Sequence, residues 1–202
     1  MTETLPSTPQ GIGHAAALIE EGAVVAFPTD TVHGLACRPH DPTALARLFE
    51  LKGRPLDRQI AWLVADIGQA AGLGLAVDAR ARAVADALWP GGVTLILPAP
   101  EGVDGALTLG VRAPDHPVAQ ALLAATGPLP VTSANPHGLP ECYSTDDVLV
   151  AFAGADLAAV IAGDSPGGVS STVLDLSVTR ARLLRERAIG RDRLEALVGP
   201  ID

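Results

Sequence analysis

Short apolar segments alternate with amphipathic stretches along this chain, and Gly and Pro residues separate them. The apolar runs have the length of strands and lie at 23–27, 59–64, 93–97, 107–111, 129–132, 158–162 and 171–175. Helical spacing of apolar side chains predicts helices at 11–22, 42–51, 78–88, 115–125 and 145–152. Because several runs are apolar throughout, their strands should be covered on both faces. The pattern predicts an α/β protein.

Composition narrows the class of protein. The 202 residues are 48% hydrophobic but only 3% aromatic, so Ala, Val, Leu and Ile must build the core. The length suits one domain, and we divide the chain into a polar N-terminal lead, 1–10, and a single domain, 11–202. The lead lacks a basic segment followed by an apolar run, and no later segment reaches about 18 uninterrupted apolar residues. We expect a soluble, cytoplasmic protein with no membrane contact.

Charge and residue types exclude several kinds of site. The formal net charge of −9 argues against a broad nucleic-acid surface, which needs clustered Lys and Arg. Cys37 and Cys142 are too few for a zinc pattern and are interpreted as buried thiols in a reducing compartment. The sequence has no Walker-type Gly-x-x-x-x-Gly-Lys and no pair of His at metal-ligand spacing. We therefore predict no metal-binding residue.

The segment Lys52-Gly53-Arg54-Pro55 carries the only lysine, while the other thirteen basic residues are arginine. An ammonium is a compact point charge on a flexible stem, and an Arg fork cannot replace it beside a phosphate. Gly53 and Pro55 should end the preceding helix, which leaves Lys52 and Arg54 in its exit turn. A cation at a helix C-terminus also complements the helix dipole, and that structural interpretation stays open.

Other polar side chains follow predicted strands, where open α/β sheets place ligand-binding groups. Turn chemistry explains each hydroxyl equally well, and an Arg at a strand end is often a solvated charge. Strand alternation would put Arg185 on the apolar face with Ala181 and Leu183, where its charge needs a partner. Four basic residues and four hydroxyl or amide residues form the candidate set: Lys52, Arg54, Arg112 and Arg185 with Thr31, Ser133, Asn135 and Ser171. Together they suit a ligand that carries a polyphosphate and a carboxylate.

From about Gly11 to Ile189 the sequence resembles the YrdC family, the threonylcarbamoyl-AMP synthases. The Lys-x-Arg and Ser-x-Asn signature of that family falls on Lys52, Arg54, Ser133 and Asn135. Further segments match in order, namely Phe27-Pro28-Thr29-Asp30-Thr31-Val32-His33-Gly34-Leu35, Trp89-Pro90-Gly91, Val111-Arg112-Ala113-Pro114, Ser171-Thr172-Val173-Leu174-Asp175 and Leu184-Arg185. The resemblance implies an α/β fold with a twisted, mixed parallel and antiparallel sheet, flanking helices and a large concave active-site surface.

The resemblance also implies a nucleotidyltransferase that makes L-threonylcarbamoyl-AMP and pyrophosphate from L-threonine, bicarbonate and ATP, for t6A modification of tRNA. By family position, Lys52 and Arg54 would be catalytic and would hold the ATP phosphates, with Ser133, Asn135 and Arg185 completing the nucleotide site. Threonine and carbamate would meet Thr31, His33, Arg112 and Ser171. Mg²⁺ would bridge phosphate oxygens and take few protein ligands. The later carbamoyl-transfer proteins of the t6A pathway are implied partners, and tRNA contact stays open.

Two departures from the family pattern bear on the amino-acid substrate. His33 stands where Tyr is usual, and Arg58-Gln59-Ile60 stands where Lys-Pro-Leu is common. The chain resembles the single-domain type, without the C-terminal domain of longer relatives. Two other hypotheses remain open at this point: a non-catalytic RNA-binding module of the same fold, and a related carbamoyl-adenylate or carbamoyltransferase enzyme with another acceptor.

Overall fold

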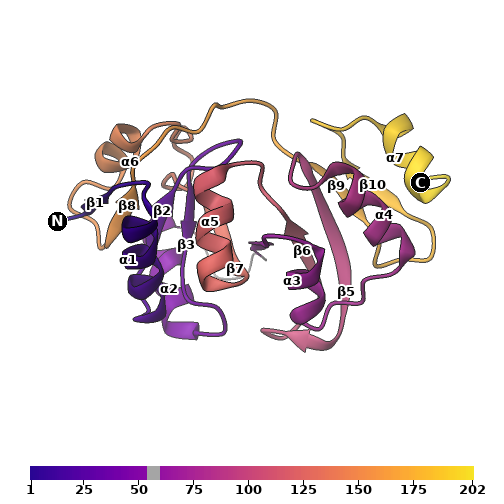
Figure 1. Ribbon diagram of the computed structural model, residues 1–202, viewed down its shortest axis with the longest axis horizontal. Helices are drawn as coiled ribbons and strands as arrows, with labels where there is room; N and C mark the ends of the chain where they lie inside the picture. The colour runs from indigo at the N-terminus through magenta and orange to yellow at the C-terminus, as the bar shows by residue number, and fades with distance from the viewer. Residues whose placement is uncertain (54–59) are drawn as a thin grey trace. The chain divides into compact units, whose positions relative to one another are not determined.

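The structure is a computed structural model that describes residues 1–53 and 60–202. The chain divides into two compact units (Figure 1). Unit 1 comprises Met1–Ile60 and His116–Gly168, and unit 2 comprises Ala61–Asp115 and Val169–Asp202. Neither unit is a continuous stretch of chain, so no linker marks a boundary in the sequence.

Unit 1 is built on short strands in the order β1-β8-β2-β3-β7. These are β1 (Glu3–Leu5), β2 (Val25–Phe27), β3 (Gly34–Ala36), β7 (Leu129–Ser133) and β8 (Ala159–Ile161). β8 pairs in parallel with β1 and β2, whereas β3 is antiparallel to β2 and β7. Every residue of β2, β3 and β8 is buried, as expected of strands covered on both faces.

The helices of unit 1 each begin at a polar cap, whose side chain accepts a hydrogen bond from a backbone N–H of the first turn. They are α1 (Pro9–Glu20), α2 (Pro42–Lys52), α5 (Pro117–Thr126) and α6 (Thr145–Ala151). Pro in the first turn of α1, α2 and α5 fits because the N–H that it lacks would have no helical partner there. α1 packs against α5 (Figure 1).

Unit 2 has strands in the order β4-β6-β5-β9-β10. They are β4 (Ala61–Leu63), β5 (Val93–Val103), β6 (Ala106–Arg112), β9 (Thr172–Asp175) and β10 (Arg182–Arg185). β4 is parallel to β6 and β5 to β9, while β5–β6 and β9–β10 are antiparallel. The α/β fold with a mixed parallel and antiparallel sheet, predicted by resemblance, is therefore confirmed.

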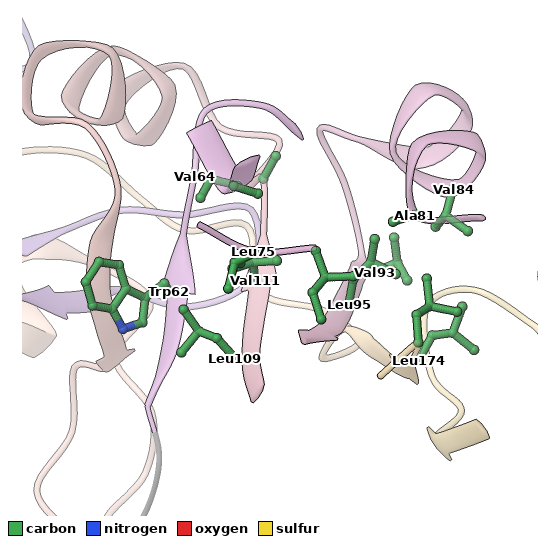
Figure 2. Packing of buried hydrophobic residues seen from close by; sticks show 14 of the residues in the cluster. Trp62, Val64, Leu75, Ala81, Val84, Val93, Leu95, Leu109, Val111 and Leu174 are labelled. Atoms are coloured by element: carbon green, nitrogen blue, oxygen red, sulfur yellow. The ribbon is translucent and has the colours of Figure 1, made fainter. Parts of the chain in front are cut away.

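The helices of unit 2 are α3 (Ile67–Gly72), α4 (Ala79–Leu88) and α7 (Arg191–Val198), and α4 packs against α7. Figure 2 shows Ala81 and Val84 of α4 over the part of the core that contains Leu174. The cluster is mainly aliphatic, with Trp62 of β4 as a large member (Figure 2). The expectation of a core poor in aromatic residues is confirmed.

Each strand and helix predicted from the apolar pattern is present, but the pattern missed five elements, one of which is β10, where only the alternation around Arg185 indicated a strand. β1 lies inside the polar lead because one apolar residue, Leu5, is enough to anchor an edge strand, and that side chain is 2% exposed. β3 has only three residues and lies in a stretch to which the sequence assigned no element. α3 is short, and α7 is mostly polar and buries one residue, Leu194. Such elements carry too few apolar positions for their period to be recognised.

Most predicted ends lie within two residues of the observed ones, but the end of β5 needs correction. β5 continues to Val103 instead of ending at residue 97, because it pairs with β6 beyond that point. α6 begins at Thr145 as predicted, and the residue before it, Ser144, forms a reciprocal capping box with Asp147. Across residues 1–53 and 60–202, no helix is long and apolar enough to cross a membrane.

Candidate active site

Lys52 is the last residue of α2 and is buried, with only 4% of its surface exposed. Its Nζ donates to the carbonyl oxygen of Ser133 at 2.7 Å, to Oδ1 of Asn135 at 2.8 Å and to Oγ of Ser133 at 3.3 Å. Ser133 Oγ also donates to Asn135 Oδ1 at 2.7 Å. The structure thus brings together three of the predicted site residues, because strand β7 ends beside the end of α2.

The local backbone holds this arrangement in place. Gly53 adopts the left-handed conformation, with φ 59°, as a cap that ends α2. The Lys52 carbonyl accepts a hydrogen bond from the His137 N–H at 2.7 Å, and Asn135 Nδ2 donates to the Leu139 carbonyl at 2.7 Å. The loop after β7 is therefore attached to α2 by main chain and side chain together. Arg54 and Arg58, which the sequence also singled out, lie outside the described residues.

The turn after β2 carries Thr31, and its hydroxyl lies 3.2 Å from that of Thr29. Thr29 Oγ1 donates to the Val32 carbonyl at 2.6 Å and accepts from the Thr31 N–H at 3.2 Å. These are the local bonds that hydroxyl-rich turns commonly make. Turn chemistry accounts for Thr29, whereas Thr31 remains a candidate ligand residue.

His33 is fully buried immediately before β3, and its Nδ1 lies 3.0 Å from Oγ of Ser165. Burial lowers the pKa of His33 to about 4, and the neighbouring Gly163 backbone and Asp164 carboxylate offset this only in part. The ring is therefore neutral near pH 7. The second nitrogen, Nε2, is buried and has no hydrogen-bond partner among residues 1–53 and 60–202. Such an atom in a native fold requires an explanation.

Ser171 and Arg185 meet in unit 2. Arg185 Nε donates to the Ser171 carbonyl at 3.0 Å, and its Nη2 donates to Ser171 Oγ at 3.2 Å. The same hydroxyl lies 2.9 Å from Oγ1 of Thr94 in β5. The register of β10 shifts between Leu183 and Arg185, so simple alternation was the wrong description, and Arg185 is exposed rather than on an apolar face. The expectation of a charge on the apolar face is therefore wrong, and Arg185 contacts the Ser171 carbonyl and hydroxyl from an exposed position.

Arg112 ends β6 and is buried, with 7% of its surface exposed. Its carbonyl accepts from the Val64 N–H at 3.0 Å, which fixes the strand end beside β4. An arginine that is almost fully removed from water differs from the solvated charge common at strand ends, because burying a charge requires compensating partners. Its role as an anion-binding residue stays a prediction from the sequence.

Sequence reasoning missed Ser165 and Thr94, both of which touch predicted site residues. Ser165 lies in Gly163-Asp164-Ser165-Pro166-Gly167, which has the Gly-x-Ser-x-Gly spacing of a nucleophile elbow, and that spacing could have drawn attention to it. The segment follows β8 and runs toward β9 without a helix, so it is not a strand–turn–helix elbow. Thr94 gives no signal, since a Thr within a strand is ordinary.

No group of three His, Cys, Asp or Glu side chains within the described parts of the chain could hold a metal ion. Cys37 and Cys142 are both buried. Burial raises the pKa of the Cys142 thiol to about 11, with a smaller contribution from the Asp147 carboxylate. This thiol therefore stays protonated at neutral pH and is a poor nucleophile or metal ligand.

Comparisons with known proteins agree with these motifs. The profile of the Sua5/YciO/YrdC family, described as "Telomere recombination", matches residues 17–187. The protein named threonylcarbamoyl-AMP synthase in Bacillus subtilis (strain 168) is 36% identical over 208 residues, which are 100% of this chain and 60% of that protein. The one of the same name in Escherichia coli O1:K1 is 37% identical over 181 residues, which are 84% of this chain and 94% of that protein.

The crystal structure of P. abyssi Sua5 complexed with L-threonine matches with a TM-score of 0.88 at 33% identity. The match covers 100% of this chain and 62% of the other. The chain thus spans about 60% of the length of the B. subtilis and P. abyssi relatives. Because the family profile covers most of the sequence and the relatives align over nearly all of it, the chain belongs to the Sua5/YciO/YrdC family.

Proposed function

We propose that this protein is a nucleotidyltransferase that forms L-threonylcarbamoyl-AMP and pyrophosphate from L-threonine, bicarbonate and ATP. The observation that carries the proposal is the buried network of Lys52, Ser133 and Asn135, because a lysine is kept from water where the family signature requires it. The names of the B. subtilis and E. coli relatives support the same activity, and the threonine complex of P. abyssi Sua5 supports threonine as the amino acid.

The proposed reaction has two bond-forming steps. The threonine amine attacks the carbon of CO2 released from bicarbonate, and loss of a proton gives the carbamate. A carbamate oxygen then attacks the α-phosphorus of ATP, and the bond to the β-phosphate oxygen breaks to release pyrophosphate. Holding the ligands in the right geometry supplies much of the rate enhancement for such a reaction. The protein's task is therefore mainly to position the ligands and stabilise negative charge.

We assign residues to the two halves of the reaction. Lys52 and Arg54 would act on the ATP phosphates, and Ser133, Asn135 and Arg185 would complete the nucleotide site. Arg112 suits the threonine carboxylate because a guanidinium offers two parallel N–H donors. Thr31, His33 and Ser171 would serve the amino acid and its carbamate. Mg²⁺ would accompany ATP on its phosphate oxygens, offsetting their charge.

The wider role follows from the proposed product. Threonylcarbamoyl-AMP would be passed to the carbamoyl-transfer proteins that modify tRNA to t6A, and the reaction would take place in the cytoplasm. Direct tRNA contact is the weaker part of the proposal, because a formal net charge of −9 opposes a broad phosphate-binding surface.

Pyrophosphate release with each ligand omitted in turn tests the proposal. We expect release only with ATP, threonine and bicarbonate together, and mass spectrometry should detect threonylcarbamoyl-AMP. Release without threonine, or no product with all three ligands present, would contradict it. Salt-sensitive RNA binding without ATP consumption would favour a binding module instead, and adenylate formation only from carbamoyl phosphate would favour the carbamoyltransferase hypothesis.

A further inference from the structure

Ser165 lies outside the predicted site, yet it is held in place from several directions. Its N–H donates to the Tyr143 carbonyl at 2.7 Å. Two residues earlier, the Gly163 N–H and carbonyl both bond to the hydroxyl of Thr145, each at 3.0 Å. The side chain of Ser165 is buried, with 4% of the residue exposed. A hydroxyl fixed in this way can determine the orientation of the groups that it contacts.

The hydroxyl of Ser165 has two partners, the N–H of Thr29 at 3.1 Å and Nδ1 of His33 at 3.0 Å. A backbone N–H can only donate, so the Thr29 N–H occupies an acceptor lone pair of Ser165 Oγ. The hydroxyl hydrogen is then available to Nδ1. Since the low pKa of His33 makes its ring neutral near pH 7, a ring that accepts at Nδ1 carries its proton on Nε2.

The opposite assignment satisfies fewer atoms. If Nδ1 donated to Ser165, the hydroxyl hydrogen would have no acceptor within hydrogen-bond distance among the residues that the structure describes. A buried hydroxyl without an acceptor is costly. Among the residues that the structure describes, the Nε2–H tautomer leaves one group without a partner, the Nε2–H, whereas the opposite assignment leaves two, Nε2 and the Ser165 hydroxyl hydrogen.

We infer that Ser165 is a positioning residue of the proposed amino-acid site, which fixes the turn carrying Thr31 through the Thr29 N–H and holds His33 in its Nε2–H tautomer. Ser165 acts at both ends of the segment from Thr29 to His33 and therefore limits how that segment can move. Its expected effect is on the use of threonine, and not on the use of ATP. This inference rests on the proposed function for its kinetic test, whereas its structural test does not.

The Gly-x-Ser-x-Gly spacing suggests a competing role for Ser165 as a nucleophile. The geometry does not favour it, because the hydroxyl is buried, bonded to the Thr29 N–H, and paired with an imidazole whose low pKa makes it a weak base. Covalent labelling of Ser165 in the wild-type protein by a fluorophosphonate probe would overturn the positioning role. We expect no labelling.

The structural test is nitrogen NMR of the full chain with isotope-labelled histidine. We expect a protonated Nε2 and an unprotonated Nδ1 for His33 near pH 7, with the signals assigned by their loss in His33→Gln. Ser165→Ala should allow the other tautomer to appear, and Ser165→Thr, which keeps a hydroxyl, should retain the original one. A proton on Nδ1 in the wild-type protein would overturn the inference whatever reaction the protein catalyses.

The kinetic test compares Ser165→Ala with Ser177→Ala in pyrophosphate release. Ser177 is a matched control because its hydroxyl also makes one short side-chain bond, 2.6 Å to Asp175 Oδ1, but in unit 2. We expect Ser165→Ala to raise the KM for threonine about tenfold, equivalent to about 1.4 kcal/mol. The KM for ATP should stay near the wild-type value, Ser177→Ala should change neither constant, and Ser165→Thr should restore threonine use. An unchanged threonine KM in a folded Ser165→Ala protein would overturn the inference.

Discussion

The neutral, buried His33 predicts that acid destabilises the protein in a defined pH window. Burial lowers its pKa in the folded chain to about 4, while an unfolded chain has the ordinary value of 6.5. Between these values the unfolded state binds the proton and the folded state does not. Stability contributed by the neutral ring is therefore complete above the unfolded pKa and is lost progressively as the pH falls toward 4.

The size of the effect follows from the two pKa values. Each unit of difference is worth about 1.36 kcal/mol, so the full loss is on the order of 3 kcal/mol. Urea unfolding of wild type and His33→Gln, followed by circular dichroism from pH 8 to about 4.5, measures it. Subtracting the variant removes the contributions of other titrating groups. The difference in free energy of unfolding should shrink steadily below about pH 6.5.

Two outcomes would refute this reasoning. A difference between wild type and His33→Gln that stays constant across the window would mean that the His33 pKa is not lowered. An NMR titration that gives His33 a pKa near the ordinary value would lead to the same conclusion directly. In either case the ring would be charged at mildly acidic pH, and its burial could not be as complete as the structure indicates.

Three further predictions concern arginine and lysine. Lys52→Arg should slow adenylate formation at least about tenfold, equivalent to roughly 1.4 kcal/mol. It should also lower the melting temperature, because a guanidinium cannot replace the hydrogen-bonded ammonium of Lys52. A fully active variant would contradict this prediction. Arg112→Ala should raise the threonine KM through a loss of roughly 2 to 4 kcal/mol, and a change confined to ATP would show the assignment to be wrong. Arg80→Ala should destabilise unit 2 by about 1 to 3 kcal/mol in thermal unfolding. The reason is that the Arg80 guanidinium donates hydrogen bonds to the carbonyls of Leu176, Val178 and Thr179. Arg82→Ala on the same helix is the control.

The main helices and strands, and the grouping of Lys52, Ser133 and Asn135 in unit 1, could be predicted from the sequence because both depend on local signals. Apolar runs of strand length located the buried strands, and Gly53 identified the end of α2. The single lysine and the Ser-x-Asn spacing selected Lys52, Ser133 and Asn135 before any geometry was known, and the structure joins these three side chains.

Other contacts depend on residues that are distant in sequence and carry no pattern. Ser165 meets Thr29 and His33 across more than 130 positions, and no local rule pairs them. Thr94 reaches Ser171 only because β5 pairs with β9 in a particular register. The sequence placed Lys52 correctly at the end of its helix but gave no sign that it is buried, since the burial comes from the loop after β7 and not from its own helix.

The alternation of the two units along the chain has a consequence for synthesis on the ribosome. When the first 115 residues have emerged, unit 1 has β1, β2 and β3 but still lacks β7 and β8, which lie on either side of the β2–β3 pair. A two-stranded ribbon of this length is not stable alone. Unit 2 likewise lacks β9 and β10 until its second segment, 169–202, is made. Neither unit can therefore finish folding early, and cutting the chain at a single point cannot produce either one. A stand-alone unit 2 would require its two segments to be fused.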